Sequence, residues 1–170
     1  MPKLSDVVDD LQGLCAGTSD EILLSEFRDQ SRVVLPRSVL SDAFGLLRDK
    51  WGFDLLVDIT CVDYLNYRGA RDRFGLVYVL ASTSDNTRLV LRVMLNESSL
   101  SVPSAVHYWN GADWLEREVW DMFGIRFEGH PDLRRILLPE EFTSYPLRKD
   151  YPLQGRGERH HFPTLTRGEA

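Results

Sequence analysis

The spacing of apolar residues predicts two helices within the first 52 residues. Apolar residues recur every three or four positions from Leu4, Ser5 can cap this first helix, and Gly17 can end it. A second helix is expected from Ser38, and Gly52 breaks it. Each helix would turn one apolar stripe toward a core, formed by Leu4, Val7, Val8, Leu11 and Leu14 in the first and by Val39, Leu40, Ala43, Phe44 and Leu47 in the second.

Apolar residues at every second position, bounded by polar turns, predict strands between and after these helices. The clearest pair is a hairpin whose second strand has two unlike faces. Leu89, Leu91, Val93 and Leu95 share one face, whereas Val90 and Met94 share the other with Arg88 and Arg92. The sheet therefore has a core side and a mixed side. The predicted strands are Ile22 to Phe27, Arg32 to Leu35, Leu55 to Cys61, Phe74 to Ala81 and Arg88 to Leu95.

A third helix is expected from a cap at Asn110 to about Met122, with Gly124 as its stop residue. Three helices interleaved unevenly with hairpins indicate an α+β fold for residues 1–128. We expect a mostly antiparallel sheet covered by helices on one face.

Residues 129–170 have a different composition. Five of the eight prolines lie there, and each removes a backbone donor and blocks a helix or a central strand. The segment also carries many leucines and aromatic residues, which a disordered tail lacks. Two interpretations fit: a segment folded back over its own domain, or an extended arm ordered by a partner. We favour the arm, and expect a domain at 1–128 followed by a partner-binding arm at 129–170.

Charge and composition exclude several classes of protein. Residues 1–128 carry a net charge of −7 and residues 129–170 a net charge of +1, so a phosphate-binding face is not expected. The longest run without polar residues is Phe74 to Ala81, far below the roughly 20 residues that span a bilayer. The N-terminus lacks the pattern of a signal peptide. These features predict a protein of the cytoplasm that reaches a membrane only through partners.

The densest polar cluster lies on the third predicted helix. Glu116, Glu118 and Asp121 invite comparison with acid/base catalysis, which would make this an independent enzyme. Arg117, however, has Asp113 four residues before it and Asp121 four after it, so intrahelical ion pairs are the stronger interpretation. Neither a nucleophile nor an oxyanion site accompanies the acids. We therefore expect this cluster to serve pairing or an interface.

Cofactor sites are not apparent. Cys15 and Cys61 are isolated, which leaves too few thiolates for an iron-sulfur cluster or a structural zinc. His130 precedes a proline at a chain reversal and is expected to form a hydrogen bond, while adjacent His160 and His161 could bind a metal only adventitiously. No glycine-rich nucleotide motif is complete.

The C-terminal segment alternates both charge signs with aromatic residues. Arg134, Arg135, Arg148 and Lys149 could suggest nucleic-acid binding, but acidic neighbours cancel most of their field. Arginine and aromatic residues are also frequent in protein interfaces. The candidate interface residues on the third helix and this segment are Glu116, Arg117, Glu118, Asp121, His130, Arg134, Arg135, Arg148, Asp150 and Tyr151.

Two long motifs resemble one family closely. The first runs from Trp114 to Ile125 (WLEREVWDMFGI) and continues from Phe127 to Leu137 (FEGHPDLRRIL). The second is YPLRKDYPL, from Tyr145 to Leu153. Both are similar to hallmarks of the C subunit of bacterial complex I, the counterpart of the mitochondrial 30 kDa subunit. Ser144 departs from the glycine usual in that family, which affects only the local turn.

The resemblance implies a cofactor-free structural subunit of the hydrophilic arm of a proton-translocating NADH:quinone oxidoreductase. In that complex, electrons pass from NADH through FMN and iron-sulfur clusters of partner subunits to quinone. The resemblance also implies contact with the D subunit of the quinone site, with the I and G subunits nearby, on the cytoplasmic side of the cell membrane. No catalytic site is expected on this chain. An alternative is the equivalent subunit of a ferredoxin-linked quinone reductase or a membrane-bound hydrogenase.

Overall fold

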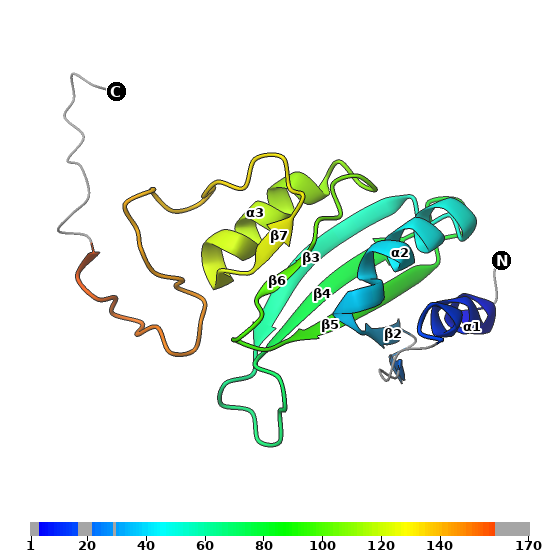
Figure 1. Cartoon of the computed structure of the whole chain (residues 1–170), viewed down its shortest axis with the longest axis horizontal. Helices are drawn as coiled ribbons and strands as arrows, with labels where there is room; N and C mark the ends of the chain where they lie inside the picture. The colour runs from blue at the N-terminus through cyan, green and yellow to red at the C-terminus, as the bar shows by residue number, and fades with distance from the viewer. Residues whose placement is uncertain (1–3, 17–21, 29, 159–170) are drawn as a thin grey trace.

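A computed structural model describes residues 4–16, 22–28 and 30–158, and shows an α+β fold (Figure 1). The expected fold class is therefore confirmed. The helices are α1 (Leu4–Leu14), η1 (Arg37–Val39), α2 (Leu40–Gly45), η2 (Leu46–Lys50) and α3 (Ala112–Phe123). The strands are β1 (Leu23–Phe27), β2 (Gln30–Leu35), β3 (Leu55–Asp63), β4 (Phe74–Ala81), β5 (Arg88–Leu95), β6 (Ser101–Pro103) and β7 (Arg126–Glu128). Within the described ranges, no helix is both long and apolar enough to cross a bilayer.

The main sheet has five strands in the order β1-β2-β5-β4-β3. All neighbours are antiparallel except β2 and β5, which run parallel, so the expected mostly antiparallel sheet is confirmed. The predicted hairpin is present with its predicted bounds, and Phe74 lies opposite Leu95 while Ala81 lies opposite Arg88. This register places the alternating leucines and valines of β5 on one face.

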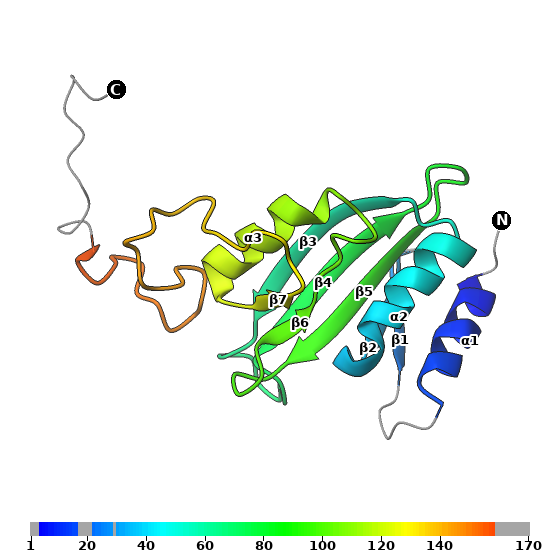
Figure 2. The ribbon, with the colours of Figure 1, turned by 45° about the horizontal axis from the view of Figure 1, so that its top comes forward.

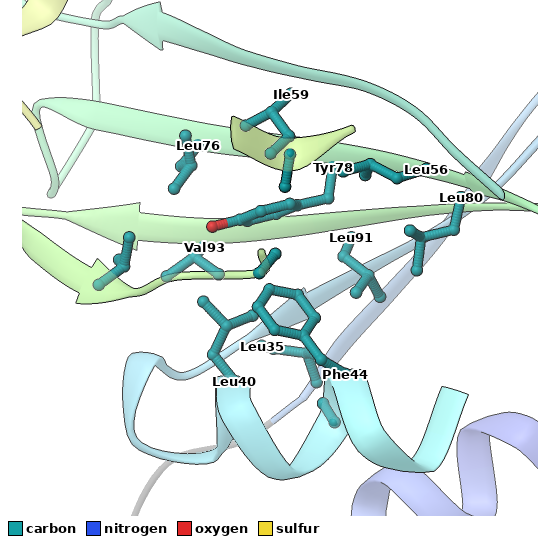
Figure 3. Close-up of a cluster of buried hydrophobic side chains, with 14 of the residues drawn as sticks. Leu35, Leu40, Phe44, Leu56, Ile59, Leu76, Tyr78, Leu80, Leu91 and Val93 are labelled. Atoms are coloured by element: carbon teal, nitrogen blue, oxygen red, sulfur yellow. The ribbon is translucent and has the colours of Figure 1, made fainter. Parts of the chain in front are cut away.

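The core lies between that face and the helices, which lie on the same side of the sheet (Figure 2). Phe44 of α2 points at the sheet beside Leu91 and Tyr78, with its ring centroid 5.0 Å from that of Tyr78 (Figure 3). The ring centroid of Trp109 lies 5.5 Å from that of Phe44, and its indole N–H donates to the carbonyl oxygen of Phe53. Burial of each such large side chain stabilises the fold by about 1.5–3 kcal/mol.

The helices start and end close to their predicted positions, with three differences. Ser5 lies inside α1, and Gly17 lies outside the described residues. The second helix combines a 3₁₀ turn, a short α-helix and a π-helical turn, and Gly52, at φ 69°, follows it as predicted. The expected cap at Asn110 is wrong, because α3 begins after Gly111 without a side-chain cap.

A second, two-stranded sheet was not predicted. β6 and β7 pair in parallel on either side of α3 in the sequence, with Val102 opposite Phe127. Each strand has only three residues, too short for alternation to be recognised. This pairing joins the segment that precedes α3 to the segment that follows it.

Part of the C-terminal segment lies against its own domain. The backbone N–H of Leu147 donates to the carbonyl oxygen of Met122, and the side chain of Arg148 donates to that of Phe123. The segment therefore makes contacts with its own domain, and its role as a partner-binding arm stays a prediction. Beyond this, the segment continues as irregular turns away from the sheet (Figure 1).

Gly124 gives a first testable prediction, because it ends α3 at φ 78° and touches the C-terminal segment. A Cβ there would lie 2.6 Å from the ring of Tyr145 and 2.8 Å from Arg148. Gly129 has a similar φ of 83° but open space around it. Gly129→Ala should therefore lower the free energy of unfolding by about 1 kcal/mol, from backbone strain alone. Gly124→Ala should cost about 2–3 kcal/mol, from strain plus overpacking. Equal losses in urea denaturation would contradict this packing.

Candidate functional site

The structure brings the two motifs together around the C-terminal half of α3. We call this region the α3 junction, defined as α3 and the part of residues 130–151 that it contacts. The candidate residues of α3 and of the following segment lie in this region, and Arg117 has different partners from those expected. Buried and half-buried charged groups hold the junction together.

Asp121 is the centre of the first cluster. Its carboxylate is fully buried. Its Oδ2 atom accepts hydrogen bonds from the backbone N–H groups of three consecutive residues, and its Oδ1 atom lies 2.5 Å from Arg135. The N–H donors and their distances are Ile136 at 3.1 Å, Leu137 at 2.9 Å and Leu138 at 2.9 Å. Burial alone would raise the pKa of Asp121, but these donors outweigh it and lower the pKa. The carboxylate therefore stays ionised and fixes the path of the chain.

Arg135 completes this cluster through its flat guanidinium group. It lies over the rings of Trp120, Phe142 and Tyr145 at 5.7, 5.9 and 5.7 Å from their centroids. Cation–π contacts of this kind contribute on the order of 0.5–2 kcal/mol, depending on how much water is excluded. An aromatic enclosure around a buried ion pair joins α3 to residues 142–145.

Arg117 corrects a prediction. The expected ion pairs with Asp113 and Asp121 are not formed, because its guanidinium donates instead to the carbonyl oxygens of Arg134 at 3.1 Å and Arg135 at 3.2 Å. Asp121 is occupied by the backbone of the next segment. Arg117 therefore binds the same strip of chain as Asp121. Arg117 donates to carbonyl oxygens of this strip, whereas Asp121 accepts hydrogen bonds from its N–H groups.

Glu116 faces a different part of the molecule. It is fully buried, and its two carboxylate oxygens accept from Ser104 Oγ at 2.7 Å and from the N–H of Ala105 at 2.5 Å. Burial raises its pKa to about 7, although both hydrogen bonds act to lower it. Glu118 is exposed. Glu116, Glu118 and Asp121 thus point to three different environments and do not form a paired-carboxylate site.

His130 forms hydrogen bonds, as predicted. Its Nδ1 accepts the N–H of Asp132 at 3.0 Å, which assigns the proton to Nε2, and Nε2 donates to the carbonyl oxygen of Asp113 at 3.1 Å. Arg134 is exposed and forms an ion pair with neighbouring Asp132 at 2.7 Å. In the described part of the chain, no group of three His, Cys, Asp or Glu side chains converges as a metal site.

Arg73 forms the second anchoring cluster, which the sequence did not reveal. Its guanidinium lies within 3.2 Å of Asp63, 2.7 Å of Glu97 and 2.8 Å of Asp150. Asp63 also accepts the N–H of Lys149 at 2.8 Å. Arg73 sits in a polar loop whose composition is that of an ordinary exposed loop. Nothing in the local sequence therefore indicated that it pairs with Asp150, 77 positions later.

Arg148 and Tyr151 complete the junction. Arg148 lies over the rings of Tyr145 at 4.6 Å and Phe74 at 5.3 Å. The hydroxyl of Tyr151 donates to Glu158 at 2.9 Å, and Ser144 donates to the same oxygen at 3.3 Å. Ser144 therefore holds the start of this loop to its end.

Comparison with known proteins identifies the class. The fold and junction define an α+β domain with a C-terminal segment held by buried charges. The family described as "Respiratory-chain NADH dehydrogenase, 30 Kd subunit" matches residues 33–157. The chain belongs to this family.

Curated relatives agree. The C subunit of the NADH-quinone oxidoreductase of Citrifermentans bemidjiense is 43% identical over 131 residues, covering 77% of this chain and 80% of the relative. The corresponding C subunit of Trichlorobacter lovleyi is 40% identical over 157 residues, covering 92% and 94%. By these relationships the chain is similar to the C subunits of NADH-quinone oxidoreductases.

Two solved structures share the fold. A trypsin-resistant fragment of Nqo5 has a TM-score of 0.68 and 35% identity, covering 76% of this chain and 98% of the fragment. A chain of an archaeal membrane-bound sulfane sulfur reductase has a TM-score of 0.67 and 22% identity, covering 87% and 86%. The second likeness shows the fold alone.

The Asp121 cluster predicts a large stability effect. Asp121→Asn removes the charge that balances Arg135 and places an amide N–H₂ against either Arg135 or the backbone donors, so the free energy of unfolding should fall by about 3 kcal/mol. Asp132→Asn breaks an exposed pair with Arg134 and should cost less than about 1 kcal/mol. Urea denaturation of both variants tests the contrast. Comparable losses would show that the Asp121 cluster is not a buried clamp.

The Glu116 cluster predicts a pH effect. The pKa of Glu116 is raised from 4.5 to about 7 in the folded protein, so its stabilising contribution is present below pH 4.5 and is lost as the pH rises to about 7. Glu116→Gln cannot ionise. Between pH 4.5 and 7.5 the native chain should therefore lose roughly 2–3 kcal/mol relative to this variant. Glu118→Gln, on the exposed face of α3, is the matched control for a change of glutamate on this helix. Stability curves for the native chain and Glu116→Gln that stay parallel would refute the buried, protonated carboxyl.

Proposed function

We propose that this chain is a structural subunit, without a redox cofactor of its own, in the hydrophilic arm of a proton-translocating NADH:quinone oxidoreductase. Partner subunits would carry the FMN and iron-sulfur clusters that pass electrons from NADH to quinone. The observation that supports a structural role is the α3 junction. Its strongest charged groups are saturated by bonds within the chain, and this arrangement builds shape more readily than it activates a substrate.

The cofactor-free part of the proposal rests on the cysteines. Burial raises the pKa of the Cys61 thiol to about 12, whereas a metal or cluster ligand must be a thiolate. Cys61 lies on β3 and Cys15 directly follows α1, so the two cysteines belong to different elements. Metal analysis and visible absorption of the purified chain should therefore give less than one equivalent of iron, zinc or flavin after dialysis.

The α3 junction also offers a surface to a partner. Large apolar side chains of the junction are exposed to solvent. The exposed fractions are 61% for Trp114 on α3, and 62% for Leu137 and 53% for Leu147 on the segment that follows. A rigid segment that presents apolar side chains binds with a smaller entropy cost than a disordered one. We propose that this surface packs against the D subunit, with the I and G subunits nearby. The chain would then be a peripheral subunit on the cytoplasmic side of the membrane, held through the complex.

A second candidate keeps the same role in a different assembly. The equivalent subunit of a ferredoxin-linked quinone reductase or a membrane-bound hydrogenase would have the same fold and the same junction. The likeness in fold to a chain of a sulfane sulfur reductase is the observation that favours considering it. Purification of the native complex, followed by assay with NADH and with reduced ferredoxin, separates the two candidates.

Arg117 provides the mutational test. Arg117→Ala frees the carbonyl oxygens of Arg134 and Arg135 and loosens the surface that the partner would bind. The amount of intact complex should fall at least three-fold, while NADH:quinone activity per assembled complex stays unchanged. Arg126→Ala, at an exposed position on β7, should leave the yield unaffected. A fully assembled but inactive Arg117→Ala complex would contradict a structural role and indicate catalysis.

A further inference from the structure

The face of the main sheet opposite the helices has an unusual composition. Among the described residues, the helices all lie on the other face (Figures 1 and 2). Antiparallel sheets with one face in water usually alternate apolar residues inward and polar residues outward. β4 does not alternate, because its outward positions Gly75, Val77, Val79 and Ala81 are all apolar or glycine. A strand with two apolar faces is typical of a sheet that is covered on both sides.

Neighbouring strands extend this apolar surface. We call the outward surface of the sheet the open face. Its centre holds the half-buried side chains of Val34, Val79, Val90 and Met94, none of which belongs to the hydrophobic core. At its edges lie exposed side chains, namely Leu23 at 60%, Leu55 at 46%, Val57 at 46% and Val62 at 39% exposure. Contiguous apolar surface of this kind marks an interaction site.

The charges on the open face indicate what covers it. Arg88 and Arg92 of β5 lie on this face, and Asp58 lies on the same face of β3, with β4 between them. Residues 1–128 as a whole carry a net charge of −7, so the arginines on this face have the opposite sign to the overall charge of the domain. A second copy of the chain, related by a two-fold axis, would bring an identical face with the same excess of positive charge to the contact. An apolar surface that carries carboxylates would instead be complementary.

We infer that the open face is covered, in the assembled complex, by an apolar, carboxylate-bearing surface of another protein subunit. This inference rests on the proposed function, since it needs a complex in which the chain has partners. It adds a second contact region, on the opposite side of the sheet from the helices. Arginines would set the orientation of the partner, and the valines and Met94 would be the apolar centre.

Cysteine labelling tests this inference in the full chain. Thr60→Cys places a thiol at an exposed position of the open face, and Asp42→Cys places one on the outer surface of α2. Both variants are reacted with a maleimide, as the isolated protein and within the purified complex. Mass spectrometry of peptides separates these sites from Cys15 and Cys61. The labelling rate at position 60 should fall at least ten-fold on assembly, and more than the rate at position 42. An unchanged rate, or equal slowing at both positions, would overturn the inference.

Charge reversal tests the chemistry of the partner. Arg88→Glu combined with Arg92→Glu should lower the recovered complex at least five-fold, while Arg71→Glu, in the exposed loop before β4, should not. Circular dichroism and thermal unfolding of the isolated chains confirm that the fold is kept. Normal recovery of the double variant would overturn the acidic partner, and a dimer in sedimentation that protects position 60 would replace it with a second copy. A complex that forms normally while position 60 stays reactive overturns this inference alone. A chain that enters no such complex overturns the proposed function with it.

Discussion

The buried carboxylate of Asp121 is the interaction on which the C-terminal half of this protein depends. An ionised carboxylate without partners would be very costly at a fully buried position. Here three successive backbone N–H groups and Arg135 surround it. The N–H groups belong to a stretch bounded by Pro131 and Pro139, where a helix or a central strand is blocked. The side chain thus replaces the hydrogen bonds that regular structure would otherwise supply.

The other charged groups of the junction extend the same principle. Arg117 satisfies carbonyl oxygens of the strip whose N–H groups Asp121 satisfies. Glu116 does the equivalent for Ser104 and Ala105 on the other side of α3. An acidic and basic helix of this kind resembles a catalytic constellation in sequence. In three dimensions its charged side chains hold irregular segments of the chain in place through hydrogen bonds, and this arrangement supports a structural role.

The sequence predicted the regular part of the fold well. The unbroken apolar run of residues 74–81 and the alternation in residues 88–95 marked the hairpin, and helical spacing marked α1 and α3. The sequence singled out Asp121 and Arg135, which the structure joins in an ion pair, but it gave no indication of Arg73. It did not reveal their partners, since Asp121 with residues 136–138 and Arg73 with Asp150 are contacts across an irregular path. Helical geometry predicts neighbours four residues apart, and here tertiary hydrogen bonds replaced those local ion pairs. The three-residue strands β6 and β7 carried too little pattern to be recognised.

The central claim is that buried charge fixes the junction before any partner binds. Amide hydrogen exchange in the isolated full-length chain tests it most directly, at the N–H groups of Ile136, Leu137 and Leu138. If Asp121 binds them in the free protein, their exchange should be slowed at least a hundred-fold relative to an unstructured peptide, approaching the protection of the β4–β5 hairpin. Exchange at the rate of an unstructured peptide, with protection appearing only in the assembled complex, would contradict the account and make the segment an arm ordered by its partner.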